Sequence, residues 1–284
     1  MKKKKKLKKL ILSAVGILAV IFIIWTLWGN TALMLTEYTV SSEKLPAAFD
    51  GYKICHISDF HDSEFGKSNE KLVNMIKNTE PDIIVITGDL VDHRRTDVPL
   101  SVSFVEQITP IAPVYYVTGN HEEQIEGFDE LIDGIMSAGA IYLNNRSMQI
   151  QKGGEHINIS GVDDPYFLVN YIDKTEQISL DKILEEVLPE EGFNILLSHR
   201  PDYFDIYVTH EIDLVLSGHA HGGQVRLPYF GGVIAPDQGL LPRYSEGQFT
   251  AGDTNMIISR GLGNSIVPLR VNNRPEVVVI TLTR

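Results

Sequence analysis

The sequence predicts an α/β fold, and three observations lead to that prediction. Short apolar segments rich in β-branched residues are typical of buried strands. They alternate with segments whose apolar residues recur at helical spacing, and this alternation is typical of an α/β fold. Polar residues follow the strand-like segments at once, at the strand ends beyond which ligands bind in open α/β sheets. The 284 residues are enough for one large domain with a substantial core.

The first element is an uncharged apolar segment that runs from Leu10 to Trp28. As a helix it is roughly 28 Å long, which is close to the hydrocarbon thickness of a bilayer. Trp25 and Trp28 lie at its far end, where aromatic belts form, and the lysine-rich residues 2–9 are expected to stay cytoplasmic. A cleaved signal peptide would have a shorter apolar region and a small-residue cleavage site, and the following WGNTALMLTEY offers no convincing site. The lysine flank also disfavours a buried core helix.

Four regions are therefore expected along the chain. They are a cytoplasmic lysine-rich tail (1–9), a transmembrane anchor (10–28), a linker with the first strand (29–50) and a large folded domain (51–284). The large domain is expected on the extracytoplasmic side of the cell membrane, held by this single pass. Seven of the 25 basic residues lie in the tail, which leaves 18 against 37 acidic residues and a formal net charge of −19. A body this acidic is not expected to bind nucleic acid, which requires a basic face.

Five strand-like segments follow, and each leads directly into residues that can bind a metal ion. They are 52–58 before Asp59 and His61, 83–87 before Asp89, 114–118 before Asn120 and His121, 195–198 before His199, and 214–217 before His219 and His221. Helices are expected over 68–79, 98–109, 128–138 and 180–188. The single cysteine, Cys55, lies in the apolar run YKICHI and is interpreted as a buried core thiol rather than a nucleophile.

The spacing of these polar residues suggests clusters of ligands. Asp59 and His61 are two residues apart, as are His219 and His221, so on an extended segment both side chains of a pair leave the same face. The glycines at 88, 119 and 218 permit tight turns before the polar residues. Each motif alone is weak, and the indication comes from their conjunction. The remaining histidines, interpreted as structural or surface residues, are His56, His93, His156 and His210.

In order, the motifs read DFH (59–61), GDLVD (88–92), GNHE (119–122), SHR (198–200) and GHAH (218–221). This set resembles the signature of the calcineurin-like metallophosphoesterase superfamily, with every element present in order. The stretches LPAAFDGYKICHISDFH, GHAHGGQVRLP and SRGLGNSIVPLRVNNRPEVVVITL resemble a bacterial membrane-associated phosphodiesterase branch, over roughly residues 38–284. The resemblance implies a four-layer α/β/β/α sandwich, and the expectation of a second sheet rests largely on it.

The resemblance also implies a role for each motif residue. One metal ion would be bound by Asp59, His61, Asp89 and His221, and the other by Asp89, Asn120, His199 and His219, with Asp89 bridging the two. His121 would face the substrate as the catalytic residue, and Asp92 would be a support residue that orients the Asn-His loop. Arg200 directly follows a ligand and is a candidate for contact with the substrate phosphate.

Two cations about 3.5–4 Å apart can neutralise a phosphate ester and supply a hydroxide for in-line attack near neutral pH. Ligands of imidazole, carboxylate and amide type favour Mn²⁺, Fe or Zn²⁺ over Cu(I), Ca²⁺ or Mg²⁺. His121 is expected to protonate the leaving oxygen or to stabilise charge on it. The loops around 224–244, rich in glycine and proline, are expected to shape the substrate mouth.

The function expected from the sequence is that of a membrane-anchored, two-metal hydrolase of a phosphate ester, with a phosphodiester favoured. The alternatives are a hydrolase of a lipid-linked diphosphate such as a UDP-2,3-diacylglucosamine-like molecule, an envelope phosphomonoesterase, and a catalytically silent metal-binding scaffold. The intact ligand set argues against the scaffold. A β-lactamase-like hydrolase is disfavoured because its H-x-H-x-D-H cluster is absent. The oligomeric state stays open.

Overall fold

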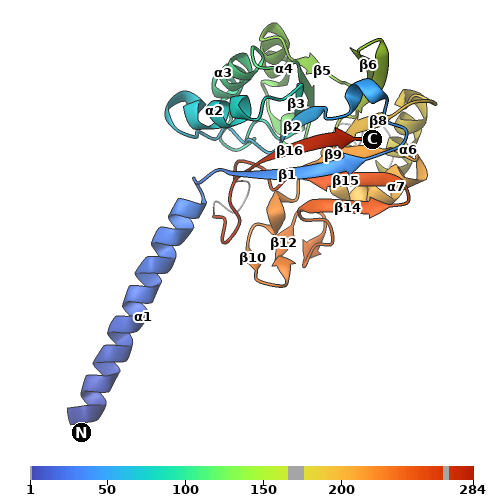
Figure 1. Cartoon of the computed structure of the whole chain (residues 1–284). Coiled ribbons are helices and arrows are strands. Elements are labelled where there is room, and N and C mark those ends of the chain that lie inside the picture. The colour runs from blue at the N-terminus through green and yellow to red at the C-terminus, as the bar shows by residue number, and fades with distance from the viewer. Residues whose placement is uncertain (1, 166–175, 265–268) are drawn as a thin grey trace.

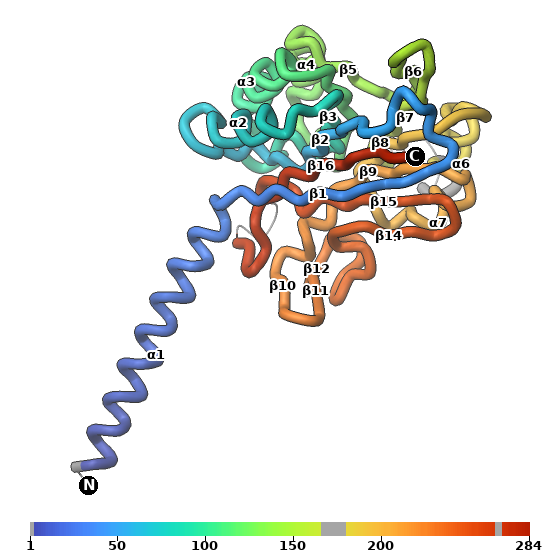
Figure 2. The backbone as a smooth tube through the Cα atoms, in the orientation of Figure 1, coloured from blue at the N-terminus to red at the C-terminus, as the bar shows by residue number. Residues whose placement is uncertain are grey.

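A computed structural model describes residues 2–165, 176–264 and 269–284. Two six-stranded sheets pack face to face, and helices cover the outer face of each sheet (Figure 1). The expected four-layer α/β/β/α architecture is confirmed. A long amino-terminal helix projects from one end of this sandwich (Figure 2).

The first sheet carries the amino-terminal half of the chain and the last strand. Its strand order is β1 (Met34–Ser41), β16 (Glu276–Thr283), β2 (Lys53–Ile57), β3 (Ile83–Thr87), β4 (Val114–Val117) and β5 (Ile141–Tyr142). Strands β2 to β5 are parallel, whereas β16 is antiparallel to β2 and parallel to β1. The two ends of the domain therefore lie side by side in this sheet.

The second sheet carries the carboxyl-terminal half. Its strand order is β14 (Gly247–Ala251), β15 (Thr254–Ile258), β9 (Leu214–Ser217), β8 (Asn194–Leu197), β7 (Glu155–Gly161) and β6 (Arg146–Lys152). The central strands β15, β9, β8 and β7 are parallel, and the edge strands β14 and β6 are antiparallel to their neighbours. Four two-residue strands, β10 (Arg226–Leu227), β11 (Gly231–Gly232), β12 (Ile234–Ala235) and β13 (Gly239–Leu240), form two small hairpins outside the sheets.

The helices pack in two groups. On the first sheet lie α2 (Glu70–Asn78), α3 (Val98–Ile108) and α4 (Phe128–Ser137), and on the second lie α6 (Glu176–Val187) and α7 (Phe204–Thr209). Short 3₁₀ turns span Ala47–Phe49, Lys67–Asn69, Glu122–Gln124, Pro201–Tyr203 and His221–Gly223. The four helices expected from sequence are present with shifted ends. Helix α2 begins two residues later than expected because Ser68 and Asn69 adopt left-handed backbone conformations, and the six-residue α7 was not expected.

Strand residues are sorted between layers by their alternation. Ile54 and Val85 point between the two sheets, whereas Cys55 and Ile84 point toward the helices. Both faces of the central strands are covered, which explains why strands such as β3 (IIVIT) and β4 (VYYV) carry no charged residue. Burial raises the pKa of the Cys55 thiol to about 12, and this agrees with the expected inert core thiol.

Helix α1 (Lys2–Gly29) contains the expected anchor, residues 10–28. Among the described residues it is the one helix long and apolar enough to cross a bilayer, with a mean hydropathy of 2.8 in its most apolar window and 6% of that window buried. The helix is joined to the domain at its end, where Asn30 donates a hydrogen bond to the carbonyl of Arg270 and accepts one from its backbone N–H, both at 2.8 Å.

Candidate metal centre

The residues expected as ligands converge where strands from both sheets end. Asp59 and His61 follow β2, Asp89 follows β3, His199 follows β8, and His219 and His221 follow β9. All six side chains are buried, and they form two groups that share Asp89. The first group is Asp59, His61, Asp89 and His221, and the second is Asp89, His199 and His219, with one donor atom from each residue within 4.8 Å of the others.

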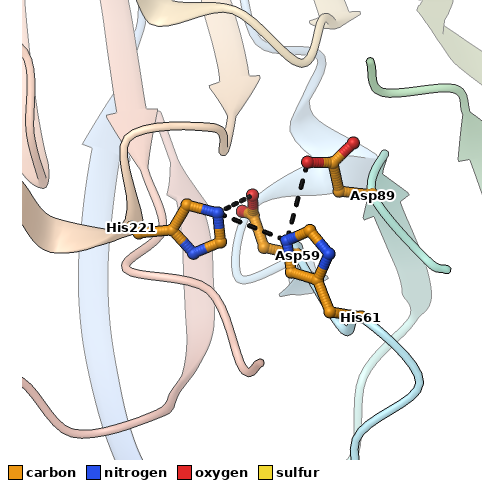
Figure 3. A group of neighbouring side chains, drawn as sticks. All are labelled: Asp59, His61, Asp89 and His221. Carbon is orange, nitrogen blue, oxygen red and sulfur yellow. Dashed lines mark hydrogen bonds and ion pairs between the residues drawn. The ribbon is translucent and has the colours of Figure 1, made fainter. Parts of the chain in front are cut away.

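The first group surrounds a small volume, as Figure 3 shows. The Nε2 atoms of His61 and His221 face each other at 3.3 Å. His221 Nε2 lies 3.3 Å from Asp59 Oδ1, and His61 Nε2 lies 3.6 Å from Asp89 Oδ2. Four donor atoms from three strand ends therefore point at one another.

The second group repeats this arrangement on the other side of Asp89. The same Asp89 Oδ2 lies 3.3 Å from His199 Nε2. His199 Nε2 in turn lies 3.2 Å from His219 Nδ1. One carboxylate oxygen thus stands between two sets of imidazole nitrogens, as a ligand shared by two cations must.

These separations fit a bound cation. Two ligands that each lie about 2.0–2.1 Å from a tetrahedral metal ion are about 3.4 Å apart, and the donor pairs here are separated by 3.2–3.6 Å. Asn120, the remaining expected ligand, follows β4, and its buried Oδ1 has no hydrogen-bond partner among the described residues. An unpaired buried carbonyl oxygen is costly unless something else, such as a cation, occupies it. The residues present therefore fit two divalent ions.

The backbone at the strand ends is bent to aim these side chains. Left-handed φ angles occur at Asp59 (50°), His61 (48°), Asp89 (50°), His219 (67°) and His221 (47°). Non-glycine residues adopt this region rarely, and such residues gather at functional sites. The preceding glycines make room: a Cβ on Gly218 would lie 1.8 Å from Ser58 Oγ, and one on Gly119 would lie 2.3 Å from Asp89 Oδ1. Close approach, more than turn geometry, requires glycine at these two positions.

Hydrogen bonds on the far side of the rings fix which nitrogen faces the centre. His199 Nδ1 lies 2.7 Å from the carbonyl oxygen of Thr87, so its proton sits there and Nε2 is left to bind metal. His219 presents the opposite edge, because its Nε2 donates to Asp237 Oδ2 at 2.8 Å and leaves Nδ1 inward. Burial opposes ionisation of Asp89, but His199, His121 and His61 outweigh it and hold the pKa of Asp89 well below its usual value.

Glu122 is a supporting residue for which sequence reasoning gave no role. Its buried carboxylate accepts hydrogen bonds from the backbone N–H groups of Asp89 at 3.1 Å, Leu90 at 2.6 Å and Gly119 at 2.7 Å. Burial and the nearby Asp89 raise the pKa of Glu122 to about 7. Glu122 thus ties the loop after β3 to the loop after β4. Its place at the end of GNHE was a usable signal, whereas Asp237 lies in a loop without a motif.

His121 is buried beside the first group, with its ring centroid 4.4 Å from that of His61. The backbone N–H of His93 donates to His121 Nδ1 at 3.2 Å, so in the neutral ring the proton lies on Nε2, which faces Asp89 at 3.9 Å. Asp92 lies 3.7 Å from Nδ1 and accepts the backbone N–H of Arg94 at 3.0 Å.

Four histidines were interpreted from the sequence as structural or surface residues, and one of them, His93, lies at the site. His93 requires a correction, because its Nδ1 lies 3.0 Å from His121 Nδ1. His56 is buried against Thr87 and has its pKa lowered to about 3 by burial, while His210 pairs with Asp181 and His156 is exposed on β7. His93 escaped notice because it follows GDLVD in a loop rather than a strand.

Arg200 occupies a position that differs from the expected substrate contact. Its buried guanidinium donates to Asp164 through Nε at 2.8 Å and Nη2 at 3.2 Å, and to Asp237 through Nη1 at 2.7 Å. It therefore holds Asp237, the partner of His219, in place. Direct contact between Arg200 and a substrate phosphate stays a prediction, and this pairing disfavours it.

Comparison with known proteins agrees with this geometry. Residues 52–223 match the family model described as calcineurin-like phosphoesterase. The chain is 32% identical to the uncharacterised metallophosphoesterase YkuE of Bacillus subtilis, over 87% of this chain and 84% of that protein. It is 28% identical to a Bos taurus "transmembrane protein with metallophosphoesterase domain", over 95% of this chain and 61% of that protein.

A similar fold occurs in the crystal structure of a dimetal phosphatase from Danio rerio, with a TM-score of 0.50 and 11% identity, covering 82% of this chain and 99% of that one. The family match spans more than half of the chain and includes all seven expected ligands. The chain therefore belongs to the calcineurin-like phosphoesterase family and is a metal-dependent phosphoester hydrolase.

Proposed function

We propose that this protein is a membrane-anchored hydrolase of phosphate esters that uses two divalent cations and prefers phosphodiesters. The observation that carries the proposal is the shared oxygen of Asp89, which lies 3.6 Å from His61 Nε2 and 3.3 Å from His199 Nε2. In this proposal Asp59, His61 and His221 complete one cation site, and Asn120, His199 and His219 complete the other. Manganese, iron and zinc suit this donor set.

When bound, the two cations would neutralise the phosphoryl oxygens and supply a hydroxide nucleophile at neutral pH. The side chains around the centre orient and stabilise the reacting groups. His121, with its proton on Nε2, is placed to donate a hydrogen bond to the leaving oxygen and so to stabilise the charge that develops on it. The backbone N–H of His93 holds the ring in that orientation. Asp92 orders the loop after β3 by accepting the backbone N–H of Arg94, and Glu122 ties this loop to the one that carries His121.

The preference for a diester rests on the cavity beside the centre. A cavity of about 330 Å³ adjoins His61 and is also lined by Asp62, Ser63, Asp92, Arg95, Asp97 and Asn264. Three carboxylates therefore face it with one guanidinium. A monoester carries two negative charges near neutral pH and a diester carries one, so this wall repels the monoester more strongly. The bulk acidity of the domain acts in the same direction.

The lipid-linked diphosphate is the second candidate, and one contact chain favours it. Asn30, directly after α1, is hydrogen-bonded to Arg270, whose Nη2 lies 3.4 Å from His221 Nδ1. Arg270 thus connects Asn30, two residues beyond the proposed membrane span, with a proposed metal ligand. A lipid headgroup at the bilayer surface would therefore lie close to the metal centre.

The orientation in the membrane belongs to the same proposal. The lysine-rich tail would remain cytoplasmic and the domain would lie on the outer face of the cell membrane, anchored by a single pass. The name of the Bos taurus relative, a transmembrane protein, supports a span. Protease added to intact spheroplasts should digest the domain; full protection would place it on the cytoplasmic side.

The decisive experiment is a substrate panel for the full chain in detergent with added Mn²⁺. The panel compares bis(p-nitrophenyl) phosphate, p-nitrophenyl phosphate, nucleotides and a UDP-linked diacyl sugar, with chelated protein and Asp89→Ala as controls. We expect metal-dependent turnover with the higher kcat/KM for the diester over the monoester. A higher value for the lipid-linked diphosphate would select the second candidate. Turnover of none of these substrates would refute the enzymatic proposal.

A further inference from the structure

The two small hairpins outside the sheets, residues 224–244, form a flap with an apolar rim. Its exposed apolar side chains include Tyr229 at 104%, Phe230 at 75%, Leu240 at 75% and Leu241 at 64% relative exposure, accompanied by Leu227 and Ile234. Soluble surfaces seldom display so many large apolar side chains on one short segment, and such patches mark contact sites. Packing of the flap does not use these side chains, because none of them belongs to the core clusters.

The flap is linked by hydrogen bonds to the end of α1. Arg226 N–H donates to the carbonyl of Val271 at 2.9 Å, and Val271 N–H donates to Gln224 at 3.3 Å. The same strip of chain, 269–274, holds Asn30 through Arg270 and stacks Arg274 over the Trp28 ring at 5.1 Å. In Figure 1 the hairpins with β10 and β12 hang below the second sheet, on the side toward which α1 extends. The flap therefore lies beside the end of α1 that joins the domain.

Five arginines lie near the rim in sequence, but most of their charge is neutralised or buried. Arg226 and Arg260 both pair with Glu246, and Arg270 is buried. Arg243 is exposed and Arg274 is half-buried over the Trp28 ring. An apolar rim with aromatic residues, next to a membrane span, is the composition of a surface that rests in the headgroup region of a bilayer.

We propose that this flap is a second membrane contact, whose rim inserts into the headgroup region beside the α1 span. The continuity with the span and the aromatic tip favour a lipid surface over a protein partner as its occupant. The opposite face of the same flap contacts the metal centre, because Asp237 accepts a hydrogen bond from His219. Bilayer contact is thereby transmitted to a proposed metal ligand through one loop. This inference deepens the proposed function, since it places the metal centre against the lipid surface.

The test reports lipid contact directly and involves no substrate. Leu240→Cys is labelled with an NBD fluorophore on the full chain; Cys55, the one native cysteine, is fully buried and should not react. The labelled protein is placed in nanodiscs that hold one copy each, made of phosphatidylcholine and phosphatidylglycerol, with and without doxyl-labelled acyl chains. Gln151→Cys, on the exposed far edge at β6, is the matched control.

An interfacial element sinks about 5–10 Å into the bilayer surface, so the label at 240 should lose about half of its emission to the lipid-borne quencher. The label at 151 should be quenched only by iodide in solution. Equal iodide quenching at both positions, without lipid quenching, would overturn the proposal. Blue-shifted emission at 240 without lipid quenching would also overturn it, because it would mean that protein covers the rim. Failure of the substrate panel would leave this result intact, so the two proposals fail separately.

A second variant guards against a local disturbance by the label. Phe230→Asp with Leu240→Asp places two charges on the rim and touches no proposed ligand. We expect this variant to keep its full metal content. A label at Leu227→Cys should be quenched by the lipid in the otherwise native flap and should lose that quenching in the charged variant. Persistent quenching at 227 in the charged variant would contradict insertion of the rim.

Discussion

The replacement of Asp237 by alanine is the sharpest test of the metal centre. Asp237 binds no metal in our assignment, but it accepts hydrogen bonds from His219 at 2.8 Å and from Arg200 at 2.7 Å. Its hydrogen bond with His219 holds the pKa of the Asp237 carboxyl at about 2, so the group is a carboxylate at neutral pH. The substitution removes the acceptor that fixes which nitrogen of His219 faces inward. Arg200 keeps both of its bonds to Asp164, and the fold should persist.

The expected magnitude follows from these contacts. Loss of the hydrogen-bond partner of a metal-ligating histidine typically costs about 10–100-fold in metal affinity. That range corresponds to roughly 1.4–2.8 kcal/mol, at about 1.4 kcal/mol for each factor of ten. The Asp237 side chain is 43% exposed, so water can replace part of the lost acceptor. We therefore expect a loss near the lower end, about tenfold.

The loss should fall on one cation alone. His199 and His219 belong to the second group, and within the described residues the side-chain carboxylate of Asp237 bonds to His219 and Arg200, not to Asp59, His61 or His221. Calorimetric titration of the metal-free full chain with Mn²⁺ should show one weakened and one unchanged binding event, and excess Mn²⁺ should restore turnover. Asp253→Ala, an exposed aspartate in the turn between β14 and β15, is the control. Equal weakening of both events, or none, would refute the assignment.

Further substitutions test the other roles. His121→Ala should lower kcat by about 10²–10⁴-fold while elemental analysis finds both metals retained; lost metals would make it a ligand. Asp89→Ala should remove both ions together, which the same analysis would reveal. Asp97→Asn keeps its helix cap on α3 and removes one charge from the cavity wall, so the monoester kcat/KM should rise about twofold relative to that of the diester. Burial raises the pKa of Asp163 to about 6 from 3.8, so the folded state binds this proton more tightly and stability falls as pH rises between about 4 and 6. Asp163→Asn should flatten that decline in melting temperature, and an unchanged slope would assign it to other groups.

The sequence predicted the strands that carry the ligands because those strands are buried on both faces. Such strands are short apolar runs, and 83–87 and 214–217 match β3 and β9 residue for residue. The pairing of β1 with β16 could not be predicted from the sequence, since it joins residues more than 230 positions apart. Only packing of the whole chain decides such a register. Helix α7 was missed because six residues give too little periodicity.

The ligand set was predictable for a chemical reason, since metal binding demands particular side chains at strand ends. The residues that support these ligands were less predictable from the sequence. Asp237 meets His219 across 18 positions of the chain and Arg200 across 37, and no local rule connects a loop aspartate with a distant imidazole or guanidinium. His93 was set aside because its approach to His121 depends on how two loops fold against each other.

The sequence alone determined that this chain has an apolar amino-terminal segment, an acidic body, and histidines and carboxylates at the ends of buried strands, because these properties reside in local composition and period. Only the tertiary structure decided that Asp89 stands between two groups of nitrogens, and that an apolar flap lies beside the end of α1 with Asp237 against His219. Those relations are distances between segments far apart along the chain, and they are set by the packing of two sheets against each other.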